Sequence, residues 1–198
     1  LNPLVQEFPE HVGPEQLVNC VARGSETWQI PIGINETDLT PYTLEAFTGE
    51  HVLISGPARS GKSTMLAAIH QMLIQQYPGI DILVSAPRRS PLGQLLPEVM
   101  PPDQLLNRVA EKGGCLLYTS PSPRDQRDDA HMIADESQVL TQALNSPESP
   151  FLFIVSGRNN DLRSLYSHWT GKIRKSRLGV LLVPDTDYDG DLLGVRLP

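Results

Sequence analysis

The sequence is poor in cysteine and in long apolar runs, and each shortage excludes a class of protein. The only two cysteines among the 198 residues are Cys20 and Cys115, and no spacing of Cys and His is typical of a metal site. We therefore expect two reduced thiols rather than a disulfide or a zinc site. No apolar run is long enough to cross a bilayer and no signal-peptide pattern is present. These features predict a cytoplasmic domain without a membrane segment.

The charge balance is acidic, with 16 Lys and Arg against 23 Asp and Glu and a net charge of −7. Such a balance argues against a surface that coats DNA as a whole, although it is compatible with a local basic patch. Hydrophobic content of 39% is ordinary for a globular protein. Because the chain begins with Leu1 rather than Met, we expect it to be a piece of a longer protein, one that could itself be membrane-anchored.

A loop of nine residues after the apolar run 51–55 carries the strongest signal. In order, its residues are Gly56, Pro57, Ala58, Arg59, Ser60, Gly61, Lys62, Ser63 and Thr64. A Gly-x-x-x-x-Gly-Lys-Ser pattern between a strand and a helix is the phosphate-binding loop of nucleoside triphosphatases. The glycines allow backbone N–H groups to face phosphate oxygens, Lys62 reaches the β- and γ-phosphates, and the Ser63 hydroxyl can ligate Mg²⁺. The sequence therefore predicts binding of ATP with Mg²⁺ and leaves hydrolysis open.

Apolar periodicity predicts an α/β fold around this loop. Expected strands are 51–55, 81–86, 115–118, 151–156 and 180–183, and expected helices are 62–77, 102–111, 136–144 and 160–169. This alternation is typical of a mostly parallel sheet with helices on both faces. Residues 28–34 and 42–47 predict short N-terminal edge strands. We expect residues 1–27 to be a linker or N-terminal extension, with a short helix near 15–22, and residues 28–198 to be the domain.

Several stretches beyond the loop resemble the FtsK/SpoIIIE group of RecA-like P-loop ATPases. They are most similar to actinobacterial multi-module members and to the EccC ATPases of type VII secretion. These stretches are 30–34 with Asp38 and Leu39, the loop itself, 86–92, 128–131 and the tail 179–198. The tail is the more specific of them, because phosphate-binding loops are shared by many families.

The resemblance implies a ring-forming ATPase whose catalytic residues include Lys62, Asp128, Asp129 and Arg158. Asp128 would complete the Mg²⁺ site with Ser63, and Asp129 would polarise the attacking water. Arg158 would sense the γ-phosphate or contact the neighbouring subunit. Simpler alternatives stay open: the two aspartates could cap a helix, and Arg158 could be an ordinary surface side chain.

One segment departs from the pattern of the family. Relatives carry the acidic pair directly after a buried strand, whereas here Pro121, Pro123 and charged residues intervene. Proline cannot lie inside a central strand. Either 115–118 is the strand and the acids follow on a loop, or the acids have lost their strand. An assembly artefact is a further explanation, because 118–125 resembles the translation of a sequencing adapter.

Two charged stretches allow both a functional and a structural interpretation. The basic stretch could contact DNA or a neighbouring subunit, or form a solvated helix face; its residues are Arg163, Lys172, Arg174, Lys175 and Arg177. Arg88 and Arg89 could steer phosphate or DNA, or belong to a plain soluble loop. The acidic stretch 185–192 is similar to the start of an EF-hand loop, but Arg196 stands where the closing Glu belongs. We therefore expect an acidic turn between two edge strands.

Two functions of different class follow from the resemblance. The first is a motor that couples ATP hydrolysis to translocation of double-stranded DNA. The alternative is an ATP-binding regulatory module of a type VII protein-secretion ATPase, which recognises a secreted partner with weak or no turnover. A nucleotide-binding pseudoenzyme is a third hypothesis. All three predict ATP binding, and the first two predict neighbouring modules or copies in a ring.

Overall fold

The computed structural model describes residues 10–18, 27–88, 90–111, 115–119, 138–145, 151–164 and 168–198. The predictions made for Cys20, Arg89, Asp128 and Asp129 lie outside these residues. The side chains of 115–119 are likewise not described, so only the backbone of that strand is discussed.

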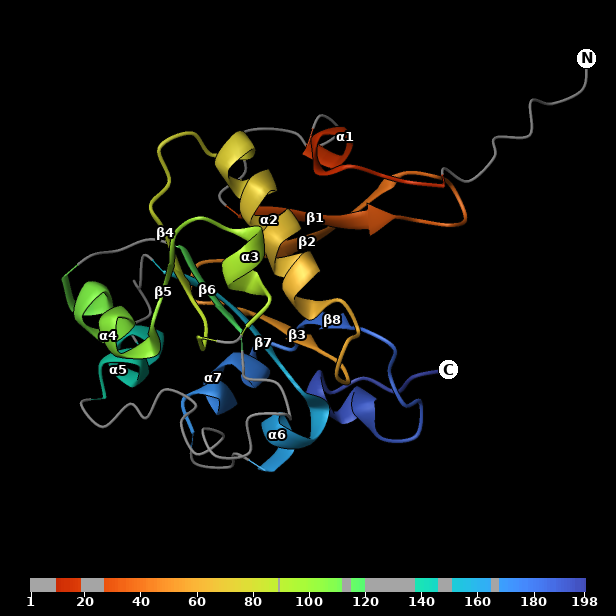
Figure 1. Ribbon diagram of the computed structural model, residues 1–198. Coiled ribbons are helices and arrows are strands. Elements are labelled where there is room, and N and C mark those ends of the chain that lie inside the picture. Colours follow the sequence, from red (N-terminus) through yellow and green to blue (C-terminus); the bar gives the residue numbers. More distant parts are fainter. Residues whose placement is uncertain are drawn as a thin grey trace, which may run out of the picture.

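The centre of the molecule is a six-stranded parallel sheet (Figure 1). In spatial order its strands are β5 (Val99–Met100), β4 (Ile82–Ser85), β6 (Cys115–Thr119), β7 (Leu152–Gly157), β3 (Val52–Ser55) and β8 (Leu178–Leu181). The predicted α/β class with a mostly parallel sheet is confirmed. Strand β6 lies between β4 and β7, so the predicted strand at 115–118 is present and central.

Helices cover both faces of this sheet. They are α1 (Pro14–Val18), α2 (Lys62–Gln76), α3 (Leu92–Leu95), α4 (Pro102–Glu111), α5 (Val139–Asn145), α6 (Asn159–Ser164) and α7 (Thr170–Lys175), with a 3₁₀ helix, η2 (Asp189–Leu192). Strand β3 shows why two faces are needed. Val52 and Ile54 join one buried cluster with α2 and α3, whereas Leu53 joins a second cluster with α4 to α7. Because successive side chains of a strand point to opposite faces, a strand with apolar residues on both faces must be covered on both.

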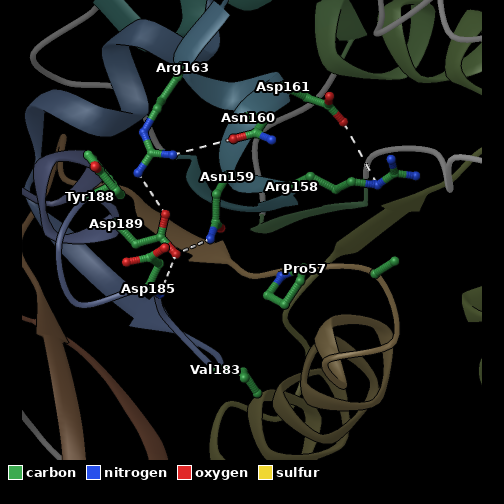
Figure 2. Close-up of a pocket in the computed structure, with 11 residues that line it drawn as sticks. Pro57, Arg158, Asn159, Asn160, Asp161, Arg163, Val183, Asp185, Tyr188 and Asp189 are labelled. Atoms are coloured by element: carbon green, nitrogen blue, oxygen red, sulfur yellow. Dashed lines mark hydrogen bonds and ion pairs between the residues drawn. The ribbon is translucent and has the colours of Figure 1, made fainter.

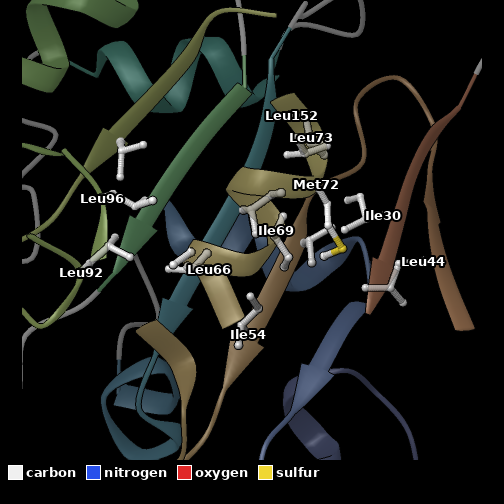
Figure 3. Close-up of a cluster of buried hydrophobic side chains, with 14 of the residues drawn as sticks. Ile30, Leu44, Ile54, Leu66, Ile69, Met72, Leu73, Leu92, Leu96 and Leu152 are labelled. Carbon is white, nitrogen blue, oxygen red and sulfur yellow. The ribbon is translucent and has the colours of Figure 1, made fainter. Parts of the chain in front are cut away.

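The first cluster fills the space between α2 and the sheet (Figure 3). Along α2, Leu66, Ile69, Met72 and Leu73 are buried at helical spacing, so one side of the helix faces the strands. Figure 3 also shows Ile30 and Leu44 of the N-terminal strands facing this helix. The helix that begins at the phosphate-binding loop is therefore fixed by the main core.

Strands β1 (Trp28–Ile34) and β2 (Pro41–Ala46) form a separate antiparallel sheet, whereas the sequence suggested edge strands of the main sheet. Contacts with α2 hold this small sheet in place. The Gln29 N–H donates to the Tyr77 hydroxyl at 2.9 Å, and the rings of Trp28 and Tyr77 lie 5.1 Å apart. Leu17 of α1 is buried in the same cluster. Residues of the predicted extension thus contribute to the core, and the boundary near residue 27 stays a prediction.

The C-terminal part differs from the sequence-based expectation in two places. Residues 160–169 were predicted as one helix, but α6 ends at Ser164 and α7 begins at Thr170. Residues 185–192 were predicted as a turn between two edge strands, but β8 is followed by η2, and no second strand occurs among residues 182–198. Hydrogen bonds to the buried carboxylate of Asp189, rather than pairing between strands, hold this segment in place. Within the described ranges, no helix has the length and apolar character required to span a membrane.

The same substitution at a buried and an exposed position of α2 tests this packing. Ile69 is 0% exposed and Ile74 is 48% exposed. We expect Ile69→Ala to lower the free energy of unfolding by about 2–5 kcal/mol, because it leaves a cavity in the core. Ile74→Ala should change it by less than about 1 kcal/mol. Urea unfolding of both variants measures the difference, and equal losses would contradict the assigned face of α2.

His51 gives the stability of the fold a pH dependence. Burial lowers the pKa of His51 from 6.5 to about 4, and its ring lies edge-on to Phe153. The unfolded chain therefore binds this proton at a higher pH than the folded chain does. Protons therefore favour unfolding between about pH 6.5 and pH 4. As the pH is lowered through this range, the free energy of unfolding should fall by up to about 1.4 kcal/mol per pH unit.

Urea unfolding across this pH range should show a flatter slope for His51→Gln than for the unsubstituted chain. Some slope should persist, because burial also lowers the pKa of His70. An unchanged slope in His51→Gln would show that His51 is not the titrating group.

Candidate functional site

The phosphate-binding loop lies at the carboxyl edge of the sheet, where β3 ends. Ser55 is the last residue of β3 and Lys62 the first of α2, so residues 56–61 form the connection. Strand β3 is buried along its length and lies between β7 and β8. Ligands of parallel α/β sheets bind at this edge, and the helix N-terminus adds a positive end to the same place.

The backbone of the loop has the shape that the pattern predicts. Arg59 and Gly61 have left-handed φ angles of 63° and 94°. A Cβ on Gly56 would lie 2.6 Å from Ser60 Oγ and 2.7 Å from the Leu182 carbonyl oxygen, so only glycine fits there. Backbone turns that include left-handed residues direct N–H groups toward one point and form anion-binding concavities. The loop therefore fits a phosphate chain.

Lys62 lies across its own loop. Its ammonium group donates hydrogen bonds to the carbonyl oxygens of Gly56 at 2.9 Å and Pro57 at 2.5 Å. Burial lowers the pKa of Lys62, and the nearby positive charge of Arg158 lowers it further. The carboxylate of Asp161 opposes these effects. An anionic ligand would act on the pKa of Lys62 in the same direction as Asp161 does.

Arg158 reaches this region because it directly follows β7, the strand beside β3. Its Nε lies 4.0 Å from an Asp161 carboxylate oxygen, and its side chain is 20% exposed. Its Nη2 is buried and has no hydrogen-bond partner among the described residues. A buried guanidinium nitrogen without a partner is costly, so this group is suited to receive an anionic oxygen.

A polar cavity of about 560 Å³ opens beside Arg158 and the start of the loop (Figure 2). Its lining residues are Pro57, Ala58, Arg158, Asn159, Asn160, Asp161, Arg163, Val183, Asp185, Tyr188 and Asp189. Figure 2 shows that these residues come from the loop, from α6 and from the tail around η2. The predicted site residues Pro57, Ala58 and Arg158 are therefore brought together.

A hydrogen-bonded network behind this cavity was missed by sequence reasoning. The Ser55 hydroxyl donates to Asn159 Oδ1, and Asn159 Nδ2 donates to Asp189 Oδ2. The Asp185 N–H donates to the same Asp189 oxygen at 2.7 Å, and Arg163 Nη2 donates to the other at 2.6 Å. The network ties the end of β3 to the tail. Its only sequence signal was the tail motif, because its members lie far apart along the chain.

The charged stretches acquire structural roles from these contacts. The buried carboxylate of Asp189 is paired with Arg163, so the acidic stretch is a structural turn. Arg163 also lies 3.2 Å from Asp191, and Arg174 donates to the Leu162 carbonyl oxygen. The predicted basic surface is thus partly used for internal pairing, and Lys175 and Arg177 are its exposed members.

The remaining predicted residues are accounted for as follows. Ser63 is half-buried and Thr64 is exposed, both in the first turn of α2. Arg88 is exposed in the loop after β4. Asp128 and Asp129 follow β6 at a distance along the chain and lie outside the described residues. Their role therefore stays a prediction.

Comparisons with known proteins identify relatives of this arrangement. No family model matches the chain. It is similar to the ESX-1 secretion system protein EccCb1 of Mycobacterium tuberculosis, with 55% identity over 42 residues, 21% of this chain and 7% of that protein. It is also similar to the ESX secretion system protein EccC of Thermomonospora curvata, with 35% identity over 75 residues, 38% of this chain and 6% of that protein.

A solved structure agrees with these relatives. The cytoplasmic domain of the Thermomonospora curvata type VII secretion ATPase EccC superposes with a TM-score of 0.64 and 17% identity, covering 98% of this chain and 25% of that one. The fold is therefore that of an ATPase module of this kind, and the resemblance to EccC ATPases inferred from the motifs is confirmed. The matched regions span less than a tenth of the length of the curated relatives.

Removal of the Asp189 carboxylate tests the network. In Asp189→Ala, Asn159 and the Asp185 N–H lose their acceptor, and Arg163 keeps its contacts with Asp191 and Asn160. We expect a loss of about 1–3 kcal/mol in the free energy of unfolding. Asp187→Ala is the matched control, because Asp187 is exposed and its backbone N–H, which the substitution keeps, donates to Asp185. It should cost less than about 0.5 kcal/mol. Similar losses in urea unfolding would contradict the network.

Proposed function

We propose that this chain is an ATP-binding module of a type VII protein-secretion ATPase. The observation that carries the proposal is the loop at the end of β3, with the Lys62 ammonium held over the carbonyl oxygens of Gly56 and Pro57. The similarity to EccCb1 and EccC supports the secretion context.

In this proposal the loop and two side chains hold the nucleotide. The backbone N–H groups of 58–64 would face the phosphates, Lys62 would bind the β- and γ-phosphates, and the Ser63 hydroxyl would ligate Mg²⁺. Nucleotide phosphates would replace the loop carbonyl oxygens as partners of Lys62. The same negative charge would offset the causes that lower the pKa of Lys62, namely burial and Arg158.

Arg158 is proposed to contact the γ-phosphate. It lies next to the Gly56 end of the loop, and one of its guanidinium nitrogens is buried and has no hydrogen-bond partner in the described part of the chain. The polar cavity beside it leaves room for the terminal phosphate and its water. A neighbouring module could also supply groups to this open cavity, which is where the expected ring contact would act.

Hydrolysis would need an acidic group opposite the loop. Strand β6 lies in the middle of the sheet, between β4 and β7, and Asp128 and Asp129 follow it along the chain. These two residues are therefore the candidates for this acidic group. We propose these two aspartates as Mg²⁺ ligand and water-polarising base, and ATP binding as the primary activity of the module.

Protein export is favoured over DNA translocation as the context of this binding. None of the relatives described above is named as a DNA translocase. The net charge is −7, and Arg163 of the basic stretch is paired with Asp189 and Asp191. We propose a cytoplasmic position next to other modules of a membrane-anchored chain, with a secreted protein as the cargo.

Substitution of the loop lysine tests the proposal. Titration calorimetry with MgATP should show binding to the unsubstituted chain. Lys62→Ala should weaken that binding about 10- to 100-fold, because charge-assisted hydrogen bonds to the phosphates are lost. Lys175→Ala, the same change at an exposed lysine of α7, should leave it unchanged. The proposal would be refuted if MgATP failed to bind to the unsubstituted, folded chain.

A turnover assay separates the two contexts. Export without DNA coupling predicts that duplex DNA changes the rate of phosphate release by less than about twofold. A large stimulation by DNA, lost in Lys62→Ala, would restore the DNA motor as the better hypothesis.

A further inference from the structure

A second cavity, of about 500 Å³, lies at the other end of the phosphate-binding loop. We propose that it is the subsite for the base and ribose of the nucleotide, an inference that rests on the proposed function. Its lining residues are Val12, Pro14, Leu17, Ile32, Gly33, Ser60, Gly61, Thr64, Met65, Ala68, Ile69, Met72, Val180 and Leu182. Cavities of this size and apolar character are typical of small-molecule sites.

The position of Lys62 fixes the direction of the nucleotide along the loop. The lysine of such loops binds the β- and γ-phosphates. Here its ammonium lies on the carbonyl oxygens of Gly56 and Pro57, on the side of Arg158. The terminal phosphate therefore belongs at that end, and the α-phosphate with its nucleoside must extend the opposite way, toward Gly61 and Thr64. These residues line the second cavity.

The chemistry of the two cavities differs in the manner that a nucleotide requires. The polar cavity holds charged side chains of both signs at the phosphate end, and Arg158 is the cation there whose Nη2 has no hydrogen-bond partner among the described residues. Among the residues that line the second cavity, none is charged, and Ser60 and Thr64 contribute its only side-chain hydroxyls. An apolar slot excludes a free phosphate but accepts a flat, neutral ring, which gains by leaving water.

Different parts of the chain build the walls of this subsite. Helix α1 and the residues just before it provide Val12, Pro14 and Leu17, β1 provides Ile32 and Gly33, and β8 with its following residue provides Val180 and Leu182. Helix α2 closes it with Met65 and Ala68. The small sheet and α1 therefore have a role beyond covering the core.

Gly33 keeps the subsite open. A Cβ built on Gly33 has no heavy atom within 4 Å, and its φ is not in the left-handed region, so a larger side chain fits without backbone strain. Gly93 on α3 has the same free space and lies outside the cavity. The two glycines form a matched pair for substitution by leucine.

Binding of MgATP and of inorganic triphosphate tests the inference. The unsubstituted chain should bind ATP at least about tenfold more tightly than triphosphate, because only ATP carries a base. Gly33→Leu should weaken ATP binding by about tenfold or more and leave triphosphate binding within about twofold. Gly93→Leu should change neither, and thermal unfolding confirms that both variants are folded.

Two results would overturn the inference without touching the proposed function. One is equal affinity of the unsubstituted chain for ATP and triphosphate, and the other is unchanged ATP binding in Gly33→Leu. Failure of the unsubstituted chain to bind either compound would instead remove the proposed function.

Photolabelling of the unsubstituted chain with 8-azido-ATP gives a readout that needs no variant. The label should enter peptides that contain residues 12–17, 32–33 or 180–182. A label confined to residues 158–164 and 183–191 would place the base in the polar cavity and refute the inference. An excess of unlabelled ATP should prevent this labelling, whereas a peptide of apolar residues should not. That result would show that a nucleotide, and not a protein side chain, occupies the cavity.

Discussion

The site depends on how tightly the loop is held between β7 and β8. The Gly56 N–H donates to the Gly157 carbonyl oxygen at 3.3 Å, and the Leu182 N–H donates to the Ser55 carbonyl oxygen at 2.8 Å. Leu182 also lies against Gly56 so closely that no side chain fits between them. These contacts fix the start of the loop relative to both neighbouring strands. Arg158 on one side and the apolar cavity on the other are placed by the same two strands.

Much of the fold could be predicted because the core strands are apolar and the helices periodic. The runs 51–55 and 151–156 became β3 and β7, and the predicted helix 102–111 has the bounds of α4. Two features depend on tertiary contacts that periodicity does not encode. Among the described strands, β1 and β2 pair only with each other, because Ile30 and Leu44 belong to the cluster that packs on α2. The tail carries no second strand because side-chain hydrogen bonds to Asp189 replace a ladder.

The candidate site divides in the same way. The loop could be predicted because its glycines, lysine and serine are contiguous, so spacing alone defines it. Asn159 and Asp189 could not be predicted, since each acquires its role from a partner distant in sequence. The acidic stretch resembled a cation-binding loop because a run of aspartates does not reveal that Arg163 neutralises it. The apolar cavity could not be predicted, because the residues that line it come from distant parts of the chain.

Helix α1 connects the upstream chain mechanically to the interior. Leu17 is buried against the same cluster as α2, and it also forms one wall of the apolar cavity. Tension on a segment joined ahead of α1 would draw Leu17 outward and widen that wall. Such tension would shorten the residence time of a ligand in the cavity, and release of the tension would lengthen it. Under the proposed function, a displacement of α1 would thus change the rate of nucleotide exchange without changing any contact to the phosphates.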